Sequence, residues 1–247
     1  MNKLKQAYIK HWKTELNDKG RFIHKGNNIF HDYFREIPFI KLKSFLDKNN
    51  IDLTDKTLLI AGCGKGTDVH YLKKFYSPKI YVCDIAEKAV DVTVASFEDV
   101  WGSVGDIEAL PFDDNSFDYS FVAASLHHLS KPTLGLYELL RVAKYGVIVI
   151  EPNDSILTRI ATSLGFAHRV EELGNYVFRF SKKDMVKIAS SLFYDYSVTR
   201  FFAIHRIAKT KPEFLILKGL NCVANIICPH WGNYIIFVIK KTQSLNE

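Results

Sequence analysis

The sequence predicts an α/β protein whose sheet is largely parallel. Short apolar segments suited to buried strands alternate with helical segments between residues 57 and 150. A glycine-rich turn follows the first of these strands, and an aspartate ends the second. Strand–helix–strand repetition of this kind is connected by right-handed crossovers, which produce a parallel sheet.

Local patterns place the individual elements. Residues 1–20 and 29–49 carry apolar side chains near helical spacing, and Pro38 is expected to kink or break the second helix. The middle of the chain predicts strands at 57–61, 80–83, 100–104, 117–124 and 146–150. Helices are predicted between them at 67–75, 87–96 and 132–141. The last third predicts a helix at 181–191, and two β-rich stretches, 197–204 and 234–240, that could pair as an antiparallel unit.

The size and charge of the chain suit one domain with additions. It has 247 residues, 47% hydrophobic and 24% charged, a composition that argues against disorder. We expect residues 1–50 to form an N-terminal helical extension and residues 51–247 the main domain, with an insert at about 155–180. The formal net charge of +6 lies in residues 1–50, which hold 11 Lys/Arg and 5 Asp/Glu. Such a segment fits an anionic acceptor, a nucleic acid, or a solvated helical arm.

The four cysteines do not indicate a disulfide framework, because Cys63 lies in the glycine turn and Cys83 in a strand. Cys222 and Cys228 with His230 match no common zinc spacing, so we expect core cysteines and no metal site. No signal peptide opens the chain, and no apolar run reaches the ~18 residues of a membrane span. A cytoplasmic protein is therefore expected.

The glycine turn restricts the class of ligand. Gly62, Gly64 and Gly66 stand between a strand and a helix in a G-x-G-x-G pattern, where they let a ligand approach the main chain closely. A dinucleotide fingerprint would require a glycine where Thr67 stands, and the P-loop pattern is absent. These departures disfavour nicotinamide, flavin and nucleoside triphosphate ligands.

Two acids follow the next strands at the same edge of the predicted sheet. Asp84 ends the second strand 22 residues after Gly62, a place from which a carboxylate can accept hydrogen bonds from ribose hydroxyls. Asp106 follows the third strand and could accept a hydrogen bond from an adenine amine, with Ile85 and Ile107 against the ring. The pattern therefore predicts an adenosine-bearing ligand.

In this order of motifs the chain resembles the small-molecule class I S-adenosylmethionine-dependent methyltransferases, of the methyltransferase domain 11 type. The residues that carry the resemblance are Gly62–Gly66, Asp84–Ile85, Asp106, Leu110–Phe112, Phe117–Asp118 and Leu126–Leu129, within about 55–200. The resemblance implies a Rossmann-like seven-stranded sheet, mostly parallel with a terminal antiparallel strand and flanked by helices. It implies S-adenosylmethionine as cofactor, lying across the ends of the first two strands and touching Ala61, Gly62, Gly64, Gly66, Asp68, Asp84, Ile85, Asp106, Ile107 and Ala124.

One position departs from the family. Its members usually carry an acid two residues before the first glycine, where it holds the methionine end of the cofactor, and this chain has Ile60. The amino group of the cofactor is then expected to find backbone carbonyls or Asp68.

The acceptor side is predicted from histidines and cations. His127 and His128 follow the fourth strand and are candidate bases for a hydroxyl acceptor, or walls of its site. His24, Arg169 and Arg179 represent the cations of the N-terminal loop and of the insert, which suit a phosphate or carboxylate on the acceptor. We expect O-methylation of a small, anionic acceptor such as a sugar of a bacterial surface polysaccharide.

Three other hypotheses remain open at this point. A nucleic-acid methyltransferase would use the basic N-terminus on phosphates, although the segment after the fourth strand, Ala123–Leu126, carries no base-flipping signature. A non-catalytic partner could have kept the fold without turnover, which Ile60 mildly favours. A dehydrogenase is the most remote of the three.

Overall fold

A computed structural model describes residues 2–15, 29–171, 174–204 and 208–242. Its strands are β1 (Thr57–Ala61), β2 (Lys79–Asp84), β3 (Val100–Val104), β4 (Phe117–Ala123), β5 (Ala143–Pro152), β6 (Asp195–Phe201) and β7 (Tyr234–Lys240). Its α-helices are α1 (Lys3–Glu15), α2 (Ile29–Lys48), α3 (Thr67–Phe75), α4 (Glu87–Ser96), α5 (Pro132–Val142), α6 (Ile156–Ser163), α7 (Lys182–Ser191) and α8 (Lys211–Ile227). Short 3-10 turns, η1 (Leu126–His128) and η2 (Pro229–Trp231), complete the described elements.

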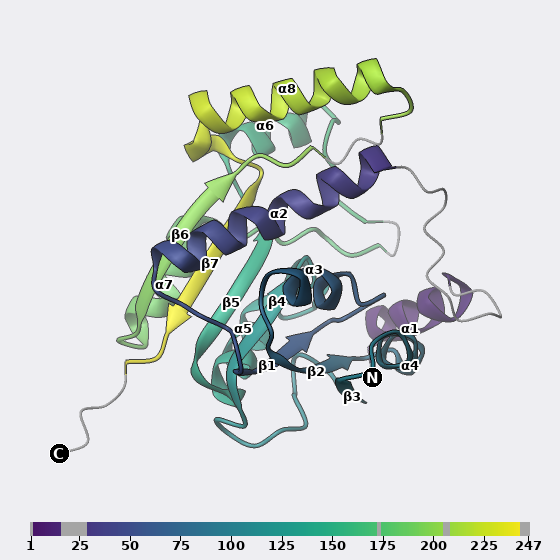
Figure 1. Ribbon diagram of the computed structural model, residues 1–247, viewed down its shortest axis with the longest axis vertical. Coiled ribbons are helices and arrows are strands. Elements are labelled where there is room, and N and C mark those ends of the chain that lie inside the picture. Colours follow the sequence, from purple (N-terminus) through teal and green to yellow (C-terminus); the bar gives the residue numbers. More distant parts are fainter. Residues whose placement is uncertain (1, 16–28, 172–173, 205–207, 243–247) are drawn as a thin grey trace.

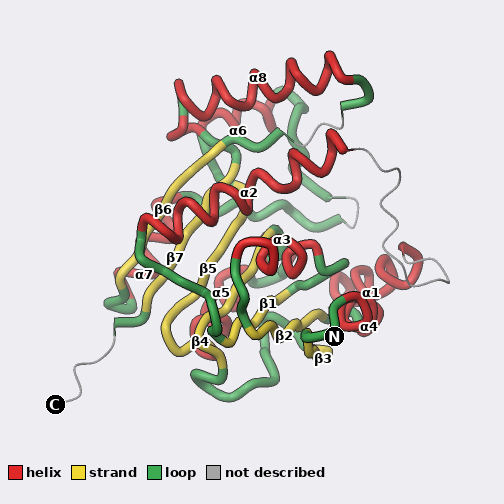
Figure 2. Tube along the Cα trace, viewed as in Figure 1, coloured by secondary structure: helices red, strands yellow, loops and turns green. Residues whose placement is uncertain are grey.

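The seven strands form one sheet in the order β3-β2-β1-β4-β5-β7-β6, with helices on both sides (Figures 1 and 2). β1 to β5 are parallel, and β7 runs antiparallel between β5 and β6. In the register, Ala61 at the end of β1 lies beside Cys83 of β2 and Val122 of β4. The loops that follow these strands therefore meet at one edge of the sheet, as the parallel connectivity requires.

Alternation along the strands divides the core between the two faces of the sheet. Leu58 and Ile60 of β1 are fully buried against α2 and α3, whereas Leu59 and Ala61 are fully buried against α5 and α7. Successive side chains of a strand point to opposite faces, so a strand covered on both sides must be apolar at every position. This explains the continuous apolar run of β1 that the sequence shows.

Helix α2 forms part of the core. It is continuous through Pro38, so the predicted break at that residue does not occur, and the proline lies inside the helix. Six of its side chains are buried in the cluster that covers one face of the sheet: Phe34, Ile37, Phe39, Leu42, Phe45 and Leu46.

The predicted strands and helices of residues 57–150 are confirmed, with β5 longer at both ends than expected. The antiparallel pairing of the two C-terminal stretches is also confirmed, as β6 with β7. Helices α6 and α8 were not predicted. Helix α8 had a local signal: the Thr210 hydroxyl accepts from the Glu213 amide at its N-terminus, with Pro212 in the first turn.

Helix α8 also corrects an expectation about the cysteines. Cys222 is exposed on this helix rather than part of the core. The helix turns several large apolar side chains outward: Leu215, Ile216, Leu220, Val223, Ile226 and Ile227. No helix in the described part of the chain is long and apolar enough to cross a membrane.

Gly146 tests the pairing of β5 with β7. Its φ is +153°, and a Cβ there would lie 2.1 Å from the Ile239 carbonyl oxygen of the neighbouring strand. We expect Gly146→Ala to lower the free energy of unfolding by about 2–4 kcal/mol, from backbone strain and overpacking. Urea denaturation measures this.

Gly219 provides the matched control, because it lies in α8 with no atom within 4 Å of an added Cβ. Gly219→Ala should leave the free energy of unfolding unchanged or raise it by up to ~1 kcal/mol. Equal stability of the two variants would contradict the close approach of β7 at Gly146.

Candidate active site

A cavity of about 580 Å³ opens at the carboxyl ends of β1, β2 and β4. The glycine turn and the loops after β2, β3 and β4 form its floor. Helix α1 and the insert after α6 contribute further walls through Leu4, Lys5, Tyr8, His11, His168 and Glu171. Ligands of open α/β sheets bind at this edge, so the cavity stands where the sequence placed the cofactor.

The glycine turn is shaped by left-handed backbone. Gly62, Gly64 and Gly66 have φ of 71°, 49° and 73°, values that glycine adopts at little cost. A Cβ at Gly62 would lie 2.5 Å from the Ser125 hydroxyl oxygen, so the turn after β1 closely approaches the loop after β4. The first glycine is therefore required by packing as well as by conformation.

Asp84 links this turn to β2. One of its carboxylate oxygens accepts from the Gly64 amide at 3.0 Å, and the other accepts from the Ala86 amide at 2.9 Å. Burial raises the pKa of the carboxyl group, and these backbone hydrogen bonds oppose the rise. Asp84 lines the cavity and positions the main chain of both loops.

Asp106 lies on the cavity wall together with Ile107, but its carboxylate already has protein partners. One oxygen accepts from the Glu108 amide at 3.0 Å, and the other pairs with the Lys5 ammonium. Lys5 also lies 2.8 Å from a carboxylate oxygen of Glu108. Lys5 of α1 therefore pairs with both acids of this loop, and these ion pairs tie the helix to the rim of the cavity.

Ile60 stands where the family usually has the acid that holds the methionine end of the cofactor. It is fully buried in the core on the α2 side of the sheet. Asp68, in the first turn of α3, lines the cavity instead. Burial raises the pKa of Asp68 to about 7, against the opposing charge of Arg35 and with a further contribution from Glu151.

His127 is held by a buried carboxylate. Glu151, fully buried at the end of β5, accepts from the amides of Ser125 and Leu126 at 2.9 and 2.7 Å through one oxygen. Its other oxygen lies 2.6 Å from His127 Nδ1. Burial lowers the pKa of His127, but the carboxylates of Glu151 and Glu171 outweigh it and raise the pKa above its usual value.

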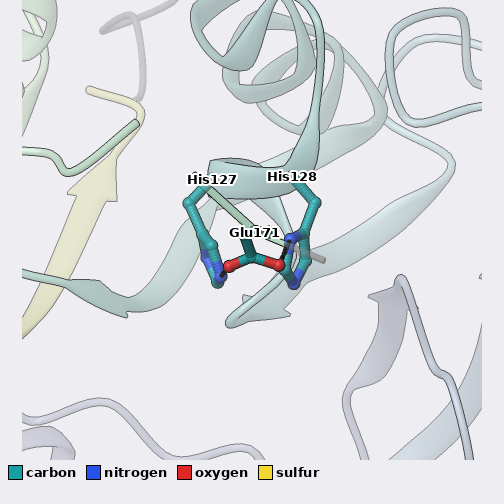
Figure 3. A group of neighbouring side chains, drawn as sticks. All are labelled: His127, His128 and Glu171. Atoms are coloured by element: carbon teal, nitrogen blue, oxygen red, sulfur yellow. Dashed lines mark ion pairs between the residues drawn. The ribbon is translucent and has the colours of Figure 1, made fainter. Parts of the chain in front are cut away.

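His128 lies on the cavity wall beside Glu171 of the insert. The Glu171 carboxylate is placed between the two histidine rings (Figure 3), 2.9 Å from His128 Nδ1 and 3.6 Å from His127 Nε2. Burial and the neighbouring His127 ring lower the pKa of His128 to about 3, so its imidazole is neutral near pH 7. Tyr8 of α1 packs against His128, with ring centroids 5.3 Å apart.

Most of the predicted cofactor residues share this cavity. Eight of them line it: Gly62, Gly64, Asp68, Asp84, Ile85, Asp106, Ile107 and Ala124. Ala61 and Gly66 do not; Ala61 is fully buried in the strand, and Gly66 precedes α3. Of the two histidines, His128 lines the cavity and His127 lies behind it.

The predicted acceptor cations are less clearly gathered. His24 lies outside the described residues. Arg169 and Arg179 are not among the lining residues, and Arg179 donates to the His168 carbonyl oxygen at 2.6 Å. His168 itself is on the wall. Arg159, another cation of the insert, pairs with Asp154.

The sequence did not point to Glu151, Glu171, Lys5 or Tyr8. Glu151 had a signal: it is an acid directly after the apolar run of β5, at the same strand edge as Asp84. The other three depend on how α1 and the insert fold over the sheet, which local patterns do not show.

This sheet order, with a glycine turn after β1 and an acid at the end of β2, defines the class I methyltransferase fold. Residues 59–150 match the family described as a methyltransferase domain. Residues 59–150 are therefore similar to a methyltransferase domain, and the cofactor that this similarity indicates is S-adenosylmethionine.

Relatives agree with this assignment. Demethylmenaquinone methyltransferase of Staphylococcus aureus is 34% identical over 93 residues, which cover 36% of this chain and only 39% of the relative. A Haemonchus contortus phosphoethanolamine N-methyltransferase with bound S-adenosylhomocysteine has a TM-score of 0.63 at 16% identity, covering 98% of this chain and 61% of that one. Magnesium protoporphyrin IX methyltransferase of Synechocystis, also with S-adenosylhomocysteine, has a TM-score of 0.59 at 13% identity, covering 90% and 88%. These structural likenesses establish the fold.

Asp84 can be tested by Asp84→Asn, which keeps the size of the side chain but removes its charge and one acceptor. We expect S-adenosylhomocysteine to bind about 1–3 kcal/mol more weakly by calorimetry, because ribose donors and loop amides lose an acceptor. Asp91→Asn, an exposed change on α4, is the control and should leave the dissociation constant unchanged. Wild-type affinity in Asp84→Asn would rule out a ribose contact.

Asp68 predicts a pH dependence of cofactor binding. With a pKa of about 7 it is mostly ionised at pH 7.5 and mostly protonated at pH 6.0. If the carboxylate pairs with the cofactor ammonium, affinity should fall roughly fivefold to tenfold over that interval as the pH is lowered. The dissociation constant of Asp68→Asn should be weaker and vary less with pH. If the dissociation constants of the wild-type protein and of Asp68→Asn changed with pH in the same way, the cofactor ammonium would not be paired with Asp68.

Proposed function

We propose that the chain is an S-adenosylmethionine-dependent methyltransferase that methylates an oxygen atom of a small acceptor. The observation that carries this proposal is that His128 and Glu171 open onto the same cavity as the glycine turn and Asp84. The expected cofactor site and a proton-accepting carboxylate thus share one cavity, which is what methyl transfer to a hydroxyl requires.

The residues at the sheet edge suit the parts of the cofactor. Asp84 would accept hydrogen bonds from the ribose hydroxyls, and Ile85 and Ile107 would hold the adenine near Asp106. Asp68, beside the glycine turn, would pair with the ammonium of the methionine end.

The reaction is an in-line displacement. Bound S-adenosylmethionine would supply the methyl carbon that the acceptor oxygen attacks, and the electron pair of the broken carbon–sulfur bond would stay on sulfur in S-adenosylhomocysteine. The hydroxyl proton passes to the carboxylate of Glu171, which the neutral ring of His128 faces at 2.9 Å on the wall. His127, fixed by Glu151, supports Glu171 from behind.

The walls favour a small acceptor over a nucleic acid. Helix α1 covers part of the cavity, and its Lys5 is engaged by Asp106 and Glu108 rather than presented to phosphates. His168 supports an anionic group on the acceptor, as on an acidic or phosphorylated sugar. Arg159 is paired with Asp154, so it does not support an anionic acceptor.

A methyl-transfer assay tests this function. S-adenosylhomocysteine release is followed with phenols, quinols, neutral sugars and anionic sugars as acceptors. We expect turnover with a hydroxyl acceptor, and a loss of roughly 10²–10⁴-fold in Glu171→Gln and His128→Gln, with cofactor affinity kept within about twofold. The exposed Glu98→Gln is the control and should match wild type.

Two results would contradict the proposal. Failure of the wild-type protein to bind S-adenosylmethionine and its product would leave a non-catalytic relative of the fold. Turnover with nitrogen or carbon acceptors alone, undiminished in both variants, would remove the hydroxyl assignment.

A further inference from the structure

The cluster of His127, His128 and Glu171 has the composition of a metal site. Their ligand atoms, two imidazole nitrogens and one carboxylate oxygen, all lie within 4.8 Å of one another. Figure 3 shows the carboxylate of Glu171 placed between the two rings. We propose that these three residues bind a divalent transition-metal ion, such as Zn²⁺, on the wall of the cavity.

His127 is oriented as a metal-binding histidine would be. The fully buried Glu151 is fixed by two backbone amides and lies 2.6 Å from His127 Nδ1. The Glu151 carboxylate therefore accepts a hydrogen bond from Nδ1, and the Nε2 atom of the same ring faces Glu171. A carboxylate behind the far nitrogen of an imidazole is the usual support of a metal-binding histidine, since it fixes the tautomer and ring.

The atoms of the cluster that face one another are not paired by hydrogen bonds. His128 Nδ1 is buried, lies 2.9 Å from Glu171, and makes no hydrogen bond. His127 Nε2 lies 3.6 Å from the other carboxylate oxygen, too far for a normal hydrogen bond. Two imidazole nitrogens and the two oxygens of Glu171 thus converge without a hydrogen bond between them.

The separations fit ligands that share one ion. Bonds of about 2.0–2.2 Å at tetrahedral or octahedral angles place neighbouring ligand atoms roughly 3.0–3.5 Å apart. The distances from His128 Nδ1 to one oxygen of Glu171, 2.9 Å, and from His127 Nε2 to the other oxygen, 3.6 Å, lie on either side of this range. Small side-chain adjustments would therefore complete the coordination.

The donor set selects the class of metal. Two imidazoles with one carboxylate suit zinc, iron, cobalt or manganese, whereas magnesium and calcium prefer sites made of oxygen atoms alone. Three protein ligands leave at least one position open.

The open position faces the cavity, because His128 and Glu171 both line it. An ion here would bind an acceptor hydroxyl or phenol and lower the pKa of that group. Activation of the acceptor by the ion rests on the proposed methyl transfer, whereas binding of the ion to the three side chains does not.

Metal titration of the whole chain tests the site without cofactor or acceptor. Chelator-treated protein is titrated with Zn²⁺ by calorimetry and with Co²⁺ by visible absorption. We expect one equivalent to bind, a loss of affinity of at least tenfold in His128→Gln and in Glu171→Gln, and a loss of about tenfold or more in Glu151→Gln, which removes the support of His127.

The control variant is His70→Gln, which removes an exposed histidine on α3 and should leave metal affinity and stoichiometry unchanged. Absence of stoichiometric Co²⁺ or Zn²⁺ binding by the wild-type protein would overturn the proposal. So would a stoichiometric site that survives both His128→Gln and Glu171→Gln with full affinity. A separate titration with S-adenosylhomocysteine after chelation tests the methyltransferase assignment, so the two proposals can fail independently.

Discussion

The buried carboxylate of Glu151 holds together the chemical side of the site. It accepts hydrogen bonds from two backbone amides of the loop after β4 and lies within hydrogen-bond distance of His127 Nδ1. One side chain at the end of β5 thus fixes the path of the loop that follows the neighbouring strand β4. A buried carboxyl group is costly unless its oxygens have hydrogen-bond partners. Glu151 finds these partners in the loop after β4, so its burial favours the observed geometry of His127, His128 and the residues around them.

Sequence patterns were sufficient for the part of the fold where local signals and connectivity agree. The strands from β1 to β5 follow from apolar runs and turn residues, and their parallel order follows from the helices between them. The glycine turn and Asp84 could be located in the same way, because cofactor contacts in this fold come from strand ends. Eight of the ten expected cofactor residues line one cavity for this reason.

The remaining features depend on contacts that are remote in sequence. Glu171 reaches the histidines only because the insert folds back over the strand edge, and Lys5 reaches Asp106 only because α1 lies across the cavity. Helix α8 was not recognised although apolar residues recur along it at helical spacing, and several of them face outward rather than into the core. The separation of Arg169 and Arg179 from the cavity follows from the same long-range folding of the insert.

The position of β7 has a consequence for how the molecule assembles during synthesis. This strand is inserted between β5 and β6 although it comes last of the three in the chain. A ribosome-bound chain that already contains the glycine turn, Asp84 and Glu151 therefore still exposes the edge of β5, whose apolar residues 147–150 are buried once β7 arrives. An uncovered apolar edge invites pairing with other chains. The sheet is therefore complete, and the edge of β5 protected from aggregation, only after residues 234–240 have been synthesised and paired as β7.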